Sequence, residues 1–178
     1  MFDSQQSILP LSFPVSVYGK KQTATVVKDV SDVEAFRYQV YFSDGTEDLF
    51  TVVEGPTDEV KDSQHCSSEY TLALERDLPI LAKLEPENWF YVMPLKVQEE
   101  PTNVWLIEDD PLPNEKENIS VYYNQKAWFE LFLPNDATPW QARKLGRSLE
   151  PIEEALVHEL LPLMEGIRNA MASLFTKG

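Results

Sequence analysis

The sequence predicts an α+β protein: antiparallel β-meanders and hairpins form one or two curved sheets or small barrel-like units, with two C-terminal helices packed on them. Three observations support this fold class. Apolar and polar residues alternate along the first fifty residues, short turn sequences separate pairs of such segments, and the last forty residues carry apolar side chains at helical spacing. Antiparallel sheets can keep one face in contact with water, which suits this alternation.

Residues 1–53 are predicted to be an N-terminal β-meander. Its strands are expected at Phe13–Val17, Thr23–Val27, Phe36–Phe42 and Leu49–Val53. The pair Asp44-Gly45 lies between the last two strands, and glycine tolerates the positive φ that a tight hairpin turn requires. We therefore expect a hairpin at this pair.

Residues 54–69 lack apolar periodicity and are rich in acidic and turn-forming residues, which predicts an acidic linker or loop. Residues 70–178 are expected to hold further hairpins and the helices. They form either a separate unit or a single domain with residues 1–53.

The segment from Tyr70 to Leu84 fits both strand and helix spacing at its start. We interpret it as a strand ending near Glu75, followed by a short helix. Asp77 and Pro79 suit the N-cap and the first turn of that helix.

Two further strand pairs are predicted after this segment. The first pair surrounds a turn at residues 99–102, and the second surrounds a turn at residues 124–126. The four strands are expected at Trp89–Val97, Val104–Ile107, Ile119–Tyr123 and Ala127–Leu133.

The C-terminal region is predicted to be helical. Thr138 and Pro139 suit the start of a short helix ending near Leu149, Pro151 begins or redirects the next helix, and Pro162 is expected to kink it. One apolar stripe follows the second helix: Leu156, Leu160, Leu163, Ile167, Met171 and Leu174. Either this stripe packs across the sheet or it joins two copies of the chain in a homodimer.

The net charge of the chain is −15. Residues 54–118 hold 16 acidic and 5 basic residues, so most of the excess lies in the middle third. Such a charge repels nucleic-acid phosphates and anionic membranes, and it favours encounter with basic proteins. We therefore expect a basic protein partner, and neither direct nucleic-acid binding nor membrane binding.

The sequence favours a non-enzymatic, acidic partner-binding protein, for example an inhibitor, an immunity protein bound to a toxin, or a mimic of nucleic acid. The candidate contacts are acidic residues in the turn at residues 99–102 and in the loop expected at residues 108–118: Glu99, Glu100, Glu108, Asp109, Asp110, Glu115 and Glu117. This interpretation requires that these carboxylates form a single negative surface. Plain solubility is the competing explanation of the charge.

No catalytic set is recognisable. His65 adjoins Cys66, but neighbouring side chains on a regular element point apart, so they do not form a nucleophilic pair. Glu154 and His158 share a helix face as metal ligands do, yet further ligands are not evident. A carboxylate- or metal-dependent hydrolase is therefore the alternative function, and no metal or cofactor is expected.

A small β-barrel that binds peptides through its aromatic residues is a further alternative, by analogy with barrels of the Tudor or SH3-like kind. Aromatic residues that alternate on strands more often pack in a core. The single cysteine, the absence of a signal peptide and the absence of a long apolar run predict a cytoplasmic protein.

Overall fold

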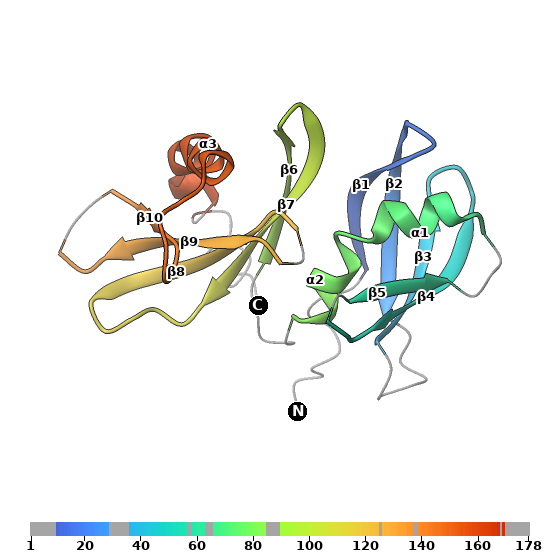
Figure 1. Cartoon of the computed structure of the whole chain (residues 1–178), viewed down its shortest axis with the longest axis horizontal. Coiled ribbons are helices and arrows are strands. Elements are labelled where there is room, and N and C mark those ends of the chain that lie inside the picture. The colour runs from blue at the N-terminus through green and yellow to red at the C-terminus, as the bar shows by residue number, and fades with distance from the viewer. Residues whose placement is uncertain are drawn as a thin grey trace.

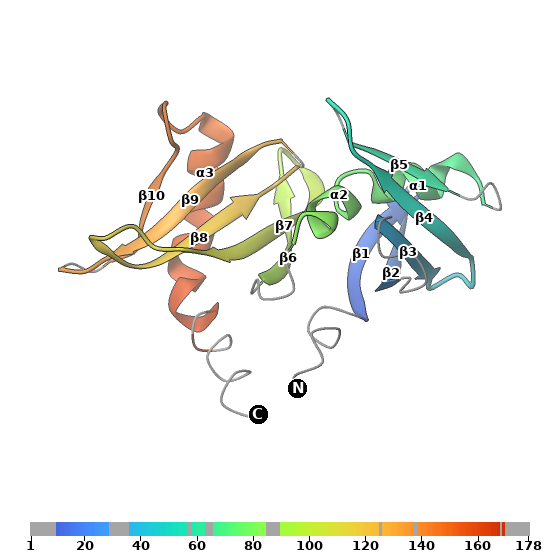
Figure 2. The same cartoon turned by 90° about the horizontal axis from the view of Figure 1, so that it is seen from below.

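The computed structural model describes residues 10–28, 36–56, 58–62, 66–84, 90–124, 126–136, 139–167 and 169. They form two five-stranded antiparallel sheets and a small number of helices, so the predicted α+β class is confirmed. The two sheets lie side by side, and a short helix lies between them in both views (Figures 1 and 2).

The first sheet is a meander in which each strand pairs with the next one along the chain. Its inward side chains alternate, as in Phe13, Val15 and Val17, and they are buried. The strands are β1 (Leu11–Val17), β2 (Lys20–Lys28), β3 (Phe36–Phe42), β4 (Glu47–Val53) and β5 (Glu59–Asp62).

The predicted hairpin at Asp44-Gly45 is confirmed. Gly45 has a φ of +92°, and its amide donates to the Phe42 carbonyl at 3.0 Å. The Asp44 side chain accepts from the Thr46 amide at 2.9 Å, which fixes the turn.

The prediction that residues 54–69 are only a linker is wrong, because they contain β5 and the start of a helix. Val60 is buried in β5, and its backbone pairs with Val52 of β4. A four-residue edge strand with a single apolar residue gives no periodicity, so the pattern could not reveal it.

The strand expected from Tyr70 is also wrong. Residues Ser68–Leu74 form helix α1, which places Tyr70 and Leu74 one turn apart against the first sheet. Helix α2 (Leu78–Ala82) follows with Pro79 in its first turn, as predicted. Asp77 precedes it, but its side chain makes no capping hydrogen bond.

The second sheet has the order β10-β9-β8-β7-β6. Its strands are β6 (Phe90–Val97), β7 (Glu100–Asp109), β8 (Glu115–Tyr122), β9 (Trp128–Pro134) and β10 (Gln141–Arg143). The predicted hairpin around residues 124–126 is present between β8 and β9.

The turn between β6 and β7 is tighter than predicted. It consists of Gln98 and Glu99, both with positive φ, so that Val97 pairs with Glu100. This conformation suits the twist of a two-residue hairpin, although neither residue is a glycine. The β7 strand therefore begins earlier than the predicted Val104.

The first of the two predicted C-terminal helices is not present. Its expected residues form β10 and an isolated bridge between Lys144 and Arg147, while Thr138 lies outside the described residues. Gln141 pairs with Phe132 of β9 and Trp140 is buried, so tertiary contacts outweigh the local helix-start signal.

Helix α3 (Pro151–Leu160) begins at the predicted proline. The Glu150 amide donates to the Glu153 carboxylate at 2.9 Å as part of a capping box. At Pro162 the α-helix gives way to a 3₁₀ turn, Leu161–Leu163, as expected where a proline removes a backbone donor.

The apolar stripe of α3 packs against the second sheet, which is the first of its two proposed explanations. Leu156, Leu160 and Ile167 are buried in that core and therefore offer no surface to a second copy. Leu163 is 44% exposed. Met171 and Leu174 lie outside the described residues.

The two halves of the protein share part of their cores. Trp105 of β7 is fully buried in the cluster formed by the first sheet, where it packs edge-on against Phe13 of β1 at 5.9 Å between ring centroids. The edge strands β1 and β6 contact each other at this junction. Among the described residues, no helix is long and apolar enough to cross a membrane.

Candidate functional site

The second sheet has one apolar and one mixed face. Ile119 and Val121 point toward α3, whereas the alternating residues Ser120 and Tyr122 point to the opposite face. Ile107 of β7 pairs with Ser120, so it lies on this opposite face too. The mixed face is not covered by α3, and its β7 side faces α2 (Figure 2).

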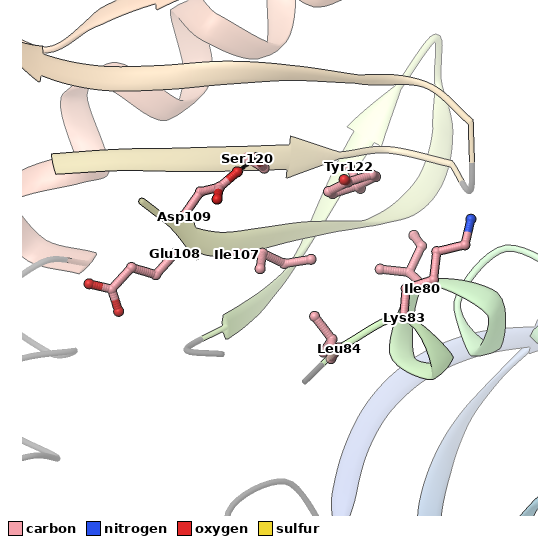
Figure 3. A pocket seen from close by; sticks show the side chains of 8 residues that line it. All are labelled: Ile80, Lys83, Leu84, Ile107, Glu108, Asp109, Ser120 and Tyr122. Atoms are coloured by element: carbon pink, nitrogen blue, oxygen red, sulfur yellow. Dashed lines mark hydrogen bonds between the residues drawn. The ribbon is translucent and has the colours of Figure 1, made fainter. Parts of the chain in front are cut away.

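A cleft of about 160 Å³ lies between α2 and this mixed face. Three apolar side chains, Ile80, Leu84 and Ile107, stand across from one another in it (Figure 3). The full lining consists of Ile80, Lys83, Leu84, Ile107, Glu108, Asp109, Ser120 and Tyr122. We call this the α2–β8 cleft.

Asp109 is the carboxylate held in the α2–β8 cleft. The Ser120 hydroxyl donates to its Oδ2 at 3.1 Å, and the Asp110 amide donates to its Oδ1 at 2.9 Å. Figure 3 shows the carboxylate beside Ser120, while Glu108 extends away from α2. These two hydrogen bonds hold the orientation of the Asp109 carboxylate.

Tyr122 forms an aromatic wall of the cleft. Its ring stacks on Trp128 at 6.0 Å between centroids, with 26° between the planes. Burial raises the pKa of the Tyr122 hydroxyl, and the charges of Asp109 and Glu130 raise it further. Asp109 therefore places a negative charge close to this wall.

Lys83 is the cation at the rim of the cleft. Its ammonium lies 3.2 Å from Asp58, whose side chain is only 11% exposed. This ion pair compensates the Lys83 charge locally, so Glu108 and Asp109 set the sign of the charge in the cleft.

The predicted acidic residues do not form a single surface. Glu99 and Glu100 lie at one end of β7 and Glu108 at the other, separated by about 27 Å of extended strand. The exposed carboxylates form two separate groups, Glu99 with Glu100 and Glu108 with Asp109 and Asp110. The expected negative surface is thus smaller than the sequence indicated.

Glu115 and Glu117 occupy different positions from those expected. Glu115 is 6% exposed, and its carboxylate accepts from Arg143, which also donates to Glu130 at 2.6 Å. Burial alone would raise the pKa of Glu115, but the Arg143 guanidinium and the Leu112 amide lower it, and the net shift is downward. Glu117 is half-buried next to a bulge in β8. Glu115 is therefore part of a buried ion-pair cluster within the chain.

A second polar cluster joins the two halves of the protein. Asp77 is 5% exposed, and its carboxylate accepts from the Trp105 indole at 2.7 Å and from the Asn103 amide at 3.1 Å. Asn103 also donates to the Pro14 carbonyl at 2.7 Å. Three segments, the residue before α2, β7 and β1, are thus linked around one buried carboxylate, which explains why Asp77 does not cap α2.

The buried Asp77 carboxylate should make the free energy of unfolding depend on pH. Burial raises the pKa of Asp77 to about 6, against the lowering by its two hydrogen bonds and Arg76. Because the folded-state pKa lies above the unfolded value, the folded state favours the protonated form. This contribution is complete below about pH 4 and is lost as the pH rises through about 6.

Asp77→Asn keeps the side chain neutral at every pH. From pH 4 to pH 7 its free energy of unfolding should therefore gain about 2 kcal/mol relative to that of the wild type. Urea unfolding of both proteins at intervals of half a pH unit measures this difference, and the other titrating groups cancel in it. Parallel stability curves would contradict the shifted pKa.

Among the residues considered for catalysis, those that the structure describes do not form an assembled centre. Burial and the nearby Asp48 raise the pKa of the Cys66 thiol to about 12, which disfavours the nucleophilic thiolate. His65 lies outside the described residues, and Glu154 and His158 are exposed on α3. Within the described residues, no three His, Cys, Asp or Glu side chains come together as metal ligands. The hydrolase alternative stays an untested prediction.

An aromatic pair lies at one end of the first sheet. Tyr18 is 62% exposed and meets Tyr70 of α1 edge-on at 6.3 Å. The Tyr18 hydroxyl donates to Ser67 at 2.6 Å, and the Tyr70 hydroxyl donates to Asp44 at 2.6 Å. Both hydroxyls are thus held within the chain, and the peptide-binding barrel stays an untested alternative.

Sequence reasoning found the two acidic residues of the α2–β8 cleft but missed the others. Ser120 could have been found, since it is a polar residue between the apolar Ile119 and Val121 of a predicted strand and therefore points to the opposite face. Ile80 and Leu84 on the α2 side could not be found in this way, because the sequence does not distinguish apolar residues that line a cleft from those in a core.

Comparison with known proteins adds no further constraint. No protein-family model matches the chain, and neither the curated proteins nor the solved structures contain a significant match.

Proposed function

We propose that this chain is a non-enzymatic binding protein that engages a basic protein through the α2–β8 cleft and the exposed carboxylates beside it. The observation that carries the proposal is the position of Asp109, which combines a fixed carboxylate with an apolar cleft at the junction of the two sheets. Inhibition of the partner and residence in the cytoplasm stay part of the proposal.

The size of the cleft supports a macromolecular partner. Sites for small-molecule substrates and cofactors usually enclose about 300–1,000 Å³. A volume of about 160 Å³ is smaller than this range and suits one side chain of a larger partner. The rest of the contact would come from the surrounding surface.

The charge supports a basic partner. Glu108, Asp109 and Asp110 are exposed within three consecutive residues, and the chain as a whole carries −15. Complementary charge of this kind raises the association rate and excludes acidic proteins more than it adds affinity. The interaction should therefore weaken as salt screens the charges.

The experiment compares two variants with equal charge. In one, Glu108, Asp109 and Asp110 become Gln, Asn and Asn; in the control, the exposed Glu47, Glu54 and Glu75 become Gln. The wild type and the control should retain a basic protein from native lysate at about 50 mM salt and release most of it at about 300 mM. The cleft variant should retain little at either concentration.

Equal retention by the two variants would contradict the proposed site. Retention that ignores salt would contradict a charge-guided interaction. Matching thermal melts of all three proteins establish that the fold is unchanged.

A further inference from the structure

We infer that the α2–β8 cleft receives an arginine side chain of the partner, with the guanidinium between Asp109 and the ring of Tyr122. This inference rests on the proposed function and names the group that the site recognises. It follows from the order in which apolar, aromatic and anionic groups occur in the cleft.

The apolar walls suit the aliphatic part of a long basic side chain. Ile80 projects from α2 and Ile107 from β7, with Leu84 beside them (Figure 3). Arginine and lysine both bury their methylene groups against such surfaces while the charged end stays near polar groups. A short or branched side chain would leave the polar end of the cleft unfilled.

The aromatic wall favours arginine over lysine. One face of Tyr122 is occupied by Trp128, and the residue lines the cleft as well. A guanidinium is planar and weakly hydrated, so it stacks on such a ring at lower desolvation cost than an ammonium. The negative charge of Asp109 near Tyr122 is attractive to a cation.

The carboxylate supplies directional recognition. Each oxygen of Asp109 accepts one hydrogen bond from within the chain, from Ser120 or from the Asp110 amide. A carboxylate has about four acceptor positions, so both oxygens can still accept from a guanidinium. Two parallel N–H···O bonds match the fork of arginine and exceed what the compact ammonium of lysine provides.

Lys83 does not cancel this attraction, because its ammonium is paired with Asp58 at 3.2 Å. It lies on the α2 side of the cleft, away from Asp109 on the sheet (Figure 3). The cleft is thus neutral toward α2 and negative toward β7.

The test uses three defined probes: N-acetyl-arginine methylamide, the corresponding lysine compound, and the uncharged norleucine compound. In a two-dimensional NMR titration, the arginine probe should give saturable shifts at Ser120 and Tyr122. The lysine probe should bind at least about threefold more weakly, and the norleucine probe should give no saturable shift.

Asp109→Asn should weaken the binding of the arginine probe about tenfold, because it removes the charged acceptor. Asp110→Asn is the matched control, since Asp110 is adjacent and exposed but does not line the cleft; its affinity should change less than about twofold. Tyr122→Phe keeps the ring and should retain most of the binding, whereas Tyr122→Leu should lose it. Thermal melts verify that each variant is folded.

Equal binding of the norleucine and arginine probes would overturn the inference, because the cleft would then be merely apolar. An unchanged affinity in Asp109→Asn, or the absence of saturable shifts, would overturn it as well. If the lysate partner is retained in that case, the proposed function stands and only the arginine assignment fails. If the arginine probe binds but no basic protein is retained, the assignment stands and the proposed function fails.

Discussion

Trp105→Ala should reduce the free energy of unfolding by about 3–5 kcal/mol, because it removes a fully buried indole from the core of the first sheet. The loss of the indole N–H also leaves the buried Asp77 with one hydrogen bond fewer, which adds about 1–3 kcal/mol. Trp105 lies on β7 of the second sheet, but its side chain packs in the core of the first sheet. Its removal should therefore uncouple the two halves as well as destabilise them.

Urea unfolding with two probes measures both effects. Tryptophan fluorescence and far-UV circular dichroism should follow one transition in the wild type and separate in the variant. Trp105→Phe isolates the hydrogen bond, because it keeps an aromatic ring beside Phe13 and Phe90. Trp128→Phe is the matched control on the mixed face and should cost less than about 1.5 kcal/mol. A loss below that value for Trp105→Ala would contradict a shared core.

Arg143→Met should cost about 3–5 kcal/mol at neutral pH. The guanidinium is the partner of two carboxylates, Glu115 and Glu130, whose side chains are 1% and 8% exposed. Removing it leaves two nearly buried negative charges without a cation. This destabilises the folded state more than replacing the whole ion-pair cluster by apolar residues would. The variant also loses the contact of Arg143 with the Phe132 ring at 4.4 Å.

The pH dependence distinguishes this cause from simple loss of packing. In the wild type the pKa of Glu115 is lowered, so its stabilising effect is present above the unfolded pKa and is lost as the pH falls through the folded value. In Arg143→Met, protonation removes the charges of the two carboxylates and thereby stabilises the folded state. The difference between the two proteins should therefore be largest near pH 7 and shrink toward pH 4, as measured by urea unfolding at both values.

The matched control is Arg76→Met, which removes an exposed ion pair with Glu100 at 3.7 Å. It should change stability by less than about 1 kcal/mol at either pH. An equal loss in both variants, or a pH-independent loss in Arg143→Met, would show that the buried ion pairs are not the cause.

Much of the fold could be predicted because it depends on local pattern. The alternation along β1, β3 and β4 and the Asp44-Gly45 turn define the first sheet, and the apolar stripe of α3 defines the helix that covers the second. These signals need only neighbouring residues. At residues 140–143 the local sequence favours a helix, but pairing with β9 is stronger and the segment forms β10.

The candidate site was harder to predict because it depends on which surfaces the fold brings together. Asp109 and Glu115 lie only six positions apart in the sequence. Asp109 lines the cleft, whereas Glu115 binds Arg143 inside the protein. Asp77 fits a helix cap by sequence and instead binds Trp105, 28 residues further along. Such pairings arise from the packing of the two sheets, and composition does not report them.

Two prolines at the junction disfavour a single continuous sheet of ten strands. Pro14 and Pro94 lie in the interiors of the edge strands β1 and β6, which contact each other without pairing. A proline has no amide hydrogen, so each edge lacks one of the donors that a continuous ladder would use. The same missing donors disfavour the addition of a strand from another molecule to β1 or β6.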